Sequence, residues 1–167
     1  MFSDASGAWG CGAICGTQWL QCPWNKVWEQ ETIALKELLP IVLAVAIWGK
    51  KWAGSHVLAR CDNTAVVEIL KSRTSRHAKI MHLVRCLHFL TAIWDINLRA
   101  EHIAGVLNTA SDAISRNLMQ VFRTVAPQAD SSPAPVPASL WEMLVTEQPD
   151  WTSSGWREKL ADFSDKA

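Results

Sequence analysis

Four acidic residues stand where carboxylates are costly to place for structural reasons alone. Asp4 and Asp62 each come at the end of a short strand-like segment, Asp112 lies early in the last helical segment, and Glu37 precedes twelve uncharged residues of a helical segment. Clustered carboxylates repel one another unless cations compensate them. An all-oxygen ligand set selects hard cations such as Mg²⁺ or Mn²⁺. Two such ions about 3.5–4 Å apart activate a water and stabilise the leaving oxygen of a phosphodiester.

Three of these acids also have an ordinary structural interpretation. Asp4 could cap the turn that follows it, Asp62 could help to start a helix, and Asp112 could favour a helix N-terminus electrostatically. Glu37 is harder to explain, since a carboxylate on a buried helix is costly without a compensating partner. The hypothesis of a metal site therefore depends on all four acids occurring together in one order of elements.

The elements that must position these acids alternate between strands and helices. Apolar periodicity and turn residues predict strands at 2–5, 8–14, 17–22, 56–61 and 97–103, and helices at 33–52, 63–70, 78–94 and 109–118. Thr32 and Asn63 are predicted N-caps. Pro40 removes a backbone donor and predicts a kink or a later start of the first helix.

This order of elements predicts an α/β domain over residues 1–118. The first three strands form an antiparallel meander, and each later strand is reached through helices, which favours parallel addition with right-handed crossovers. If the strands that precede Asp4 and Asp62 are parallel neighbours, both carboxylates project from the carboxyl edge of the sheet. Open α/β sheets bind their ligands at that edge.

Composition excludes several other classes of protein. The chain has 167 residues, of which 49% are hydrophobic and 19% charged, so it can fill a core. The first ten residues do not resemble a secretory signal, and the uncharged stretch Leu38–Gly49 is too short for a bilayer, which takes about 20 residues. Five Cys without a secretory context predict reduced thiols in an intracellular protein, cytoplasmic or nuclear, without a membrane partner.

The chain divides by charge and by proline content. Residues 1–126 carry thirteen Lys and Arg against nine Asp and Glu, a net charge of +4, whereas 127–167 carry −4. Four Pro among residues 126–138 predict an extended linker, assigned to 119–138. The helical tail over 139–167 is too short for its own core, so it either packs on the first segment or belongs to a larger domain.

Four motifs together resemble the ribonuclease H domain of retroelement reverse transcriptases. They are FSDAS at 2–6, LKELL at 35–39, CDNTAVVEIL at 61–70 and HIAGVLNTASDAISR at 102–116. The likeness is strongest to tyrosine-recombinase retrotransposons of the DIRS and Ngaro types, and it covers about residues 1–118. It implies a ribonuclease H-like fold with a five-stranded mixed sheet flanked by helices. The chain departs from the family at Pro40 and at Ser111, where Ala is usual.

The resemblance also implies functional roles and partners. Asp4, Glu37, Asp62 and Asp112 would hold two Mg²⁺ or Mn²⁺ ions, and His102 would assist product release or proton transfer. The implied reaction is hydrolysis of the RNA strand of an RNA–DNA hybrid during reverse transcription. A reverse transcriptase domain is expected upstream. Residues 140–160 are similar to the start of a tyrosine recombinase region, so we expect a polyprotein fragment or a decayed copy.

A basic segment is the predicted contact with nucleic acid. Residues 71–79 contain no acid, and their cations would bind phosphates and make affinity fall with salt. The alternative is a solvated connection between two helices. The predicted nucleic-acid contacts are Asn63, Lys71, Arg73, Arg76, Lys79 and Asn108, of which Asn108 matches the loop Asn of the family.

Three functions fit the sequence. The first is an active ribonuclease H, and the second is a catalytically silent spacer or nucleic-acid-binding module with the same fold. The third is another nuclease or transposase of the superfamily, which would need a different acid in the last helix and a longer insertion before it. Neither of those features is seen, and the presence of all four acids favours the first function.

Overall fold

The computed structural model describes residues 1–145. Of the predicted tail over 139–167, residues 146–167 lie outside the described residues. The chain alternates strands and helices in the predicted order, with additional short elements. The elements are β1 (Phe2–Ala5), β2 (Gly10–Cys15), β3 (Gln18–Pro23), α1 (Lys26–Glu29), α2 (Ile33–Trp48), η1 (Gly49–Trp52), β4 (His56–Cys61), α3 (Thr64–Ser72), α4 (Ala78–Ile93), β5 (Asn97–His102), η2 (Gly105–Leu107), α5 (Thr109–Ser115), α6 (Met119–Val125) and α7 (Ala138–Val145).

The strands form one mixed five-stranded sheet in the order β3-β2-β1-β4-β5. β1, β2 and β3 pair antiparallel, whereas β4 pairs parallel to β1 and β5 pairs parallel to β4. The α/β class, the meander and the parallel additions predicted from the sequence are therefore confirmed. Because β1 and β4 are parallel neighbours, their carboxyl ends meet at one edge of the sheet.

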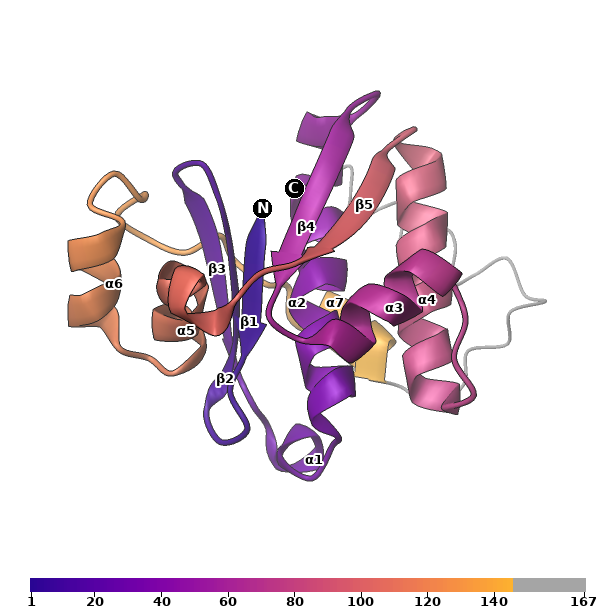
Figure 1. Ribbon diagram of the computed structural model, residues 1–167, viewed down its shortest axis with the longest axis horizontal. Helices are drawn as coiled ribbons and strands as arrows, with labels where there is room; N and C mark the ends of the chain where they lie inside the picture. The colour runs from indigo at the N-terminus through magenta and orange to yellow at the C-terminus, as the bar shows by residue number, and fades with distance from the viewer. Residues whose placement is uncertain (146–167) are drawn as a thin grey trace.

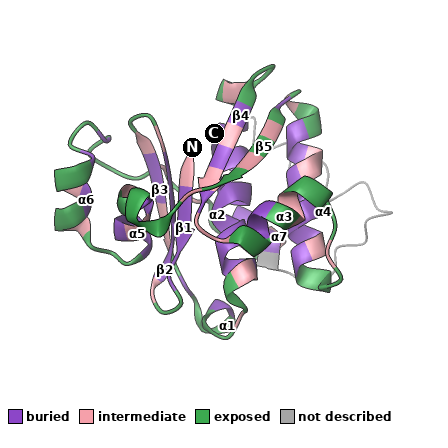
Figure 2. Cartoon of the chain, viewed as in Figure 1, coloured by how far each residue is buried: buried purple, intermediate pink, exposed green. Residues whose placement is uncertain are grey.

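Helices α2, α4 and α7 lie on one face of the sheet (Figure 1). Every residue of α2 from Leu35 to Trp48 is buried, which Figure 2 shows as an almost continuous buried column behind the sheet. A helix that is apolar all round can be stable only between other layers of the protein, as α2 is here. None of the described helices has the length and hydropathy that a membrane span requires.

Helix α5 covers the opposite face of β1, β2 and β3, where a second, smaller core forms. Ile14 and Trp19 of the sheet pack there with Ile114 of α5 and Phe122 of α6. The rings of Trp19 and Phe122 are 4.8 Å apart between centroids. Gly12 lets α5 approach the sheet closely, because a Cβ at this position would lie 2.2 Å from Cγ2 and 2.7 Å from Cβ of Ile114.

We expect Gly12→Ala to push α5 away from the sheet. The added methyl group collides with the branched base of a buried side chain, and overpacking of this kind costs about 1–3 kcal/mol. Urea unfolding measures the change in the free energy of unfolding. Gly7→Ala is the matched control, because a Cβ on Gly7 meets no atom within 4 Å. Equal stability of the two variants would show that α5 does not need this close approach.

Several boundaries differ from the sequence prediction. The first helix begins at Ile33 and continues through Pro40, so the expected later start is wrong; Thr32 caps it as predicted. The last predicted helix ends at Ser115, because Asn117 adopts a left-handed backbone with a φ of 58°. Helix α1 was not predicted. It is a single turn that is capped by Asn25.

The segment predicted as a linker from residue 119 is partly folded onto the domain, which corrects that prediction. Its first part is helix α6, which buries Phe122. The following residues run beside β3, where the backbone N–H groups of Asp130 and Ala134 donate to the carbonyls of Thr17 and Trp19. The proline-rich composition does keep residues 126–137 free of helix and strand. Hydrogen bonds to the sheet edge fix the segment in place without a core of its own.

The described part of the tail also packs on the first domain. Helix α7 buries Leu140 and Leu144 in the main core. The ring of Trp141 lies 5.5 Å from that of Trp28, measured between centroids. Of the two possibilities that the sequence leaves open for residues 139–145, the structure therefore shows packing on the first segment.

Candidate metal centre

Three acids converge at the carboxyl edge of β1 and β4. The register pairs Phe2 with Arg60, so Asp4 lies level with Asp62, two residues further along each strand. Glu37 reaches the same point from the first turns of α2. One carboxylate oxygen from each of Asp4, Glu37 and Asp62 lies within 4.8 Å of the other two. Acids that are 33 and 25 residues apart along the chain thus form one cluster.

Glu37 is the most strongly perturbed acid of this cluster. Its side chain is 4% exposed, and the backbone N–H of Ala5 donates to its carboxylate. The Oε2 atom is buried without a hydrogen-bond partner among the described residues. Burial, followed by repulsion from Asp4 and Asp62, raises the pKa of Glu37 from 4.5 to about 9. A buried carboxylate oxygen without a donor is an atom that a cation would satisfy.

Asp4 is also buried and perturbed, with 4% of its surface exposed. Burial raises its pKa from 3.8 to about 6, against the opposing effect of a hydrogen bond from the Ser115 hydroxyl to Oδ2. The negative charges of Asp62 and Asp112 raise the pKa further. The hydrogen bond from Ser115 also joins the end of α5 to β1, so one contact both orients Asp4 and holds the helix.

The arrangement fits a divalent cation. Carboxylate oxygens from separate elements surround one point, and hard cations such as Mg²⁺ and Mn²⁺ prefer such ligands. Burial and mutual repulsion together penalise the ionised form of Asp4 and Glu37, and a cation at that point would remove this penalty. Asp4, Glu37 and Asp62 can therefore hold a metal ion.

The fourth predicted acid, Asp112, stands beside the cluster but is engaged elsewhere. It lies in the first turn of α5, and Nε of Arg116 donates to its Oδ1 at 2.6 Å. This i,i+4 ion pair is partly exposed, with 38% of the Asp112 side chain accessible. The charge of Asp112 nevertheless raises the pKa of both Asp4 and Glu37, so the four acids share one electrostatic site.

His102 lies at the end of β5, level with Cys61 and so one residue before Asp62 on the neighbouring strand. The side chain is exposed. The backbone after it turns toward the cluster, since a Cβ on Gly105 would lie 3.0 Å from Oδ2 of Asp62. The loop from His102 to α5 therefore borders the acidic cluster, and the proton-transfer role of His102 stays a prediction.

Asn108 is not available to nucleic acid, which corrects its predicted role. It is 1% exposed, its Nδ2 donates to the Ser3 carbonyl at 2.9 Å, and its Oδ1 accepts from Ser111 Oγ at 2.5 Å. The residue ties the start of α5 to β1, next to Asp4. The same contact satisfies the buried Oγ of Ser111, which donates to Asn108.

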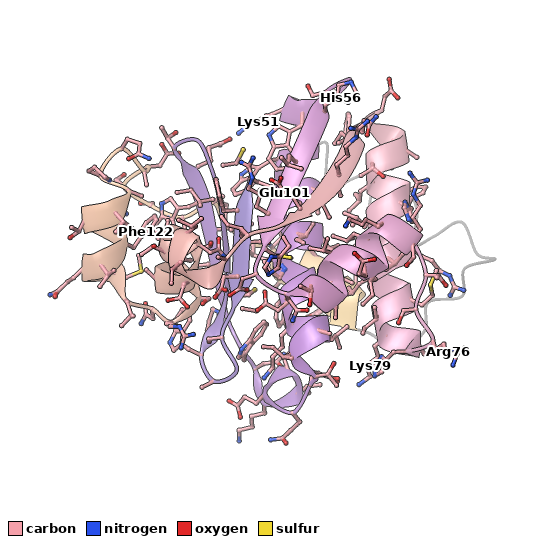
Figure 3. The ribbon with its side chains drawn as sticks, viewed as in Figure 1. Lys51, His56, Arg76, Lys79, Glu101 and Phe122 are labelled. Atoms are coloured by element: carbon pink, nitrogen blue, oxygen red, sulfur yellow. The ribbon has the colours of Figure 1, made fainter. Side chains whose placement is uncertain are left out.

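The predicted nucleic-acid contacts around α3 are mostly exposed. Asn63 uses its Oδ1 to cap α3 through the Val66 N–H. Lys71 pairs with Glu68 and Lys79 pairs with Glu31. Arg73 and Arg76 are exposed, and within residues 1–145 neither forms an ion pair. Figure 3 shows Arg76 and Lys79 close together where α4 begins, whereas Lys51 and His56 lie at the opposite end of the molecule.

Sequence reasoning missed Ser115, which contacts the cluster, and the buried Lys36 next to Glu37. The Ser115 hydroxyl donates a hydrogen bond to Asp4. One signal could have revealed this residue: Ser115 lies three residues after Asp112, and this spacing puts both on one face of a helix. Lys36, next to Glu37, is 3% exposed and donates from Nζ to the carbonyls of Gly7 at 2.7 Å and Glu29 at 3.0 Å. A buried Lys with backbone partners leaves no signal in the sequence beyond its position on an apolar helix.

We compared the chain with models of known protein families, with curated proteins and with solved structures, and none of the three comparisons gave a match.

Proposed function

We propose that the chain is a metal-dependent endonuclease that hydrolyses the RNA strand of RNA–DNA hybrids. The observation that carries this proposal is the convergence of one carboxylate oxygen each from Asp4, Glu37 and Asp62 within 4.8 Å, where Oε2 of Glu37 is buried and has no hydrogen-bond partner in residues 1–145. A spacer domain would have no reason to keep ionisable groups in such a costly arrangement. A cluster that binds a divalent cation accounts for them.

The architecture is compatible with a ribonuclease H-like fold. A mixed sheet of five strands, a buried helix that carries Glu37 and a last helix that carries Asp112 are the parts that the sequence resemblance requires. In this interpretation Asp4, Glu37 and Asp62 would hold one Mg²⁺ or Mn²⁺ ion, and Asp112 would be a ligand of a second ion. On the same resemblance we propose that the chain derives from a retroelement polyprotein that also encodes a reverse transcriptase and a recombinase.

The chain's own groups have distinct tasks in this chemistry. When bound, the divalent ions would supply Lewis acidity and neutralise the charge that develops on the phosphodiester. Ser115 and the Ala5 N–H orient Asp4 and Glu37. His102, exposed at the end of β5, would assist proton transfer or product release, as the sequence resemblance implies. Selection of the RNA strand would come from contacts to 2′-hydroxyl groups rather than to base edges.

Cleavage of end-labelled substrates tests the proposal directly. The purified chain is incubated with an RNA–DNA hybrid, an RNA duplex and a DNA duplex of one sequence, with Mg²⁺ or with EDTA. We expect cleavage of the RNA strand of the hybrid alone, and only with Mg²⁺. Binding of the hybrid without cleavage under all conditions would instead favour the silent nucleic-acid-binding module.

We expect Arg73→Gln/Arg76→Gln to weaken binding of the hybrid and to reduce its dependence on salt. Each phosphate contact that is lost lowers the slope of log K against log[salt] by about 0.9, so the double variant lowers it by about 1.8 if both residues contact phosphates. Fluorescence anisotropy between 50 and 200 mM salt measures the slope. Lys50→Gln/Lys51→Gln removes the same charge at the other end of the sheet and serves as the control. Identical slopes for the two double variants would exclude a contact at Arg73 and Arg76.

A further inference from the structure

Arg116 is the positive charge that acts on the acidic cluster. The hydrogen bond and the charge of Asp112 raise the pKa of Arg116, with smaller effects of Asp4 and Asp62. Arg116 in turn lowers the pKa of Asp4. Among the described residues the guanidinium is thus a positive charge beside Asp112, the acid outside the set of three.

The position of Arg116 is fixed by its helix rather than by burial. It directly follows Ser115, the last residue of α5, and its Nε approaches Oδ1 of Asp112, four residues earlier, at 2.6 Å. Its neighbour Ser115 is hydrogen-bonded to Asp4, which anchors this end of the helix to β1. The guanidinium thus stands where α5 meets the cluster, and 57% of the Arg116 side chain is exposed. Because more than half of this side chain is exposed, the guanidinium can move from Asp112 into solvent.

We propose that Arg116 is a positioning residue that holds Asp112 when the second divalent ion is absent and so lowers the affinity of the site for that ion. The inference rests on the proposed function, because it needs Asp112 to be a ligand of the second ion. When that ion binds, it replaces the guanidinium of Arg116 as the positive partner of Asp112. The guanidinium is displaced into solvent, while α5 keeps its place through Ser115 and Asn108.

The expected change in affinity for the second ion follows from the exposure of the Arg116–Asp112 ion pair. An exposed i,i+4 ion pair changes an equilibrium by only about twofold. A positive charge a few ångströms from a bound divalent ion adds repulsion, which partial exposure to water reduces but does not remove. We therefore expect Arg116→Gln to tighten binding of the second ion by about three- to tenfold and to change binding of the first ion by less than about twofold.

Titration with Mn²⁺ in the absence of nucleic acid measures both affinities. Electron paramagnetic resonance reports free Mn²⁺, so the two dissociation constants are obtained from one binding curve for wild type and for Arg116→Gln. Lys51→Gln is the matched control, because it removes one positive charge from the exposed far end of the molecule (Figure 3). An unchanged second dissociation constant in Arg116→Gln would overturn the proposal.

A second pair of variants tests whether Arg116 acts through Asp112. In the Asp112→Asn background there is no ion pair to release and the second ion has lost a ligand, so Arg116→Gln should change the remaining Mn²⁺ binding by less than about twofold. If the substitution still tightens Mn²⁺ binding there by about three- to tenfold, Arg116 acts without Asp112 and the proposal is wrong.

The same titration separates failure of this inference from failure of the proposed function. If wild type binds no Mn²⁺, or binds it equally well with Asp4→Asn, the metal centre itself is wrong. If wild type binds one ion that depends on Asp4 and a second that ignores Arg116, the metal centre stands and only the role of Arg116 is lost.

Discussion

Asp62→Asn is expected to abolish cleavage of the RNA–DNA hybrid. The substitution keeps the shape of the side chain but replaces an anionic ligand by a neutral amide, in a cluster whose oxygens lie within 4.8 Å of one another. A metal ion contributes several kcal/mol to the stabilisation of a phosphoryl transition state. Its loss corresponds to about a 10²- to 10⁴-fold fall in the cleavage rate. Single-turnover cleavage of a labelled hybrid at saturating Mg²⁺ measures the change.

Asp95→Asn is the matched control for this experiment. Asp95 is exposed in the turn between α4 and β5, and its left-handed backbone, with a φ of 51°, suits Asn as well as Asp. The control should cleave at the wild-type rate and shows that loss of one carboxylate is not in itself harmful. Equal rates for Asp62→Asn and wild type would eliminate Asp62 as a metal ligand.

Glu37→Gln is expected to stabilise the metal-free protein at neutral pH. The pKa of Glu37 is about 9 in the folded chain against an ordinary value of 4.5, so the folded state binds this proton more tightly than the unfolded state. The free energy of unfolding therefore falls as the pH rises from 4.5 toward 9. At pH 7 the lost stability amounts to about 3 kcal/mol, which a neutral Gln avoids.

Urea unfolding in EDTA at pH 5 and pH 7 measures the free energy of unfolding of both proteins and checks the direction of this effect. The advantage of Glu37→Gln over wild type should shrink below about 1 kcal/mol at pH 5, because Glu37 is protonated in the folded state and the pH lies close to its ordinary pKa of 4.5 in the unfolded state. Excess Mg²⁺ should stabilise wild type at pH 7 and leave the variant unchanged, since ligand binding stabilises only the state that binds. Glu68→Gln, on the exposed face of α3, is the control. A variant less stable than wild type at pH 7 would contradict the prediction.

The elements with a strong local signal could be predicted from the sequence. The largely apolar helix after Thr32, the cap at Asn63 and the strand that precedes Asp62 all follow from residue types and spacing, and the structure has them. Helix α1 is a single turn, too short for apolar periodicity to reveal. Helix α6 was missed because its one buried anchor, Phe122, gains its partner from Trp19 in the sheet, more than 100 residues earlier.

The candidate site could be predicted in part. Asp4 and Asp62 meet because parallel neighbouring strands end at one edge, which the order of elements implies. The buried amide of Asn108 and the engagement of Asp112 by Arg116 depend on how α5 lies on the sheet. That position is set by the close contact of Gly12 and Ile114 and not by any property of the α5 sequence alone. The roles of individual acids therefore needed the structure.

The backbone hydrogen bonds that Asp130 and Ala134 donate at the edge of β3 have a consequence for any shortened form of the protein. An uncovered outer strand offers a row of unpaired peptide groups to a second molecule, which is the usual route to sheet-to-sheet self-association. Removal of everything after residue 118, where the sequence suggests a natural end, would uncover that row and also expose the indole of Trp19. The residues that follow 118 thus cover the outer edge of β3, and a shortened protein that does not self-associate has to retain them.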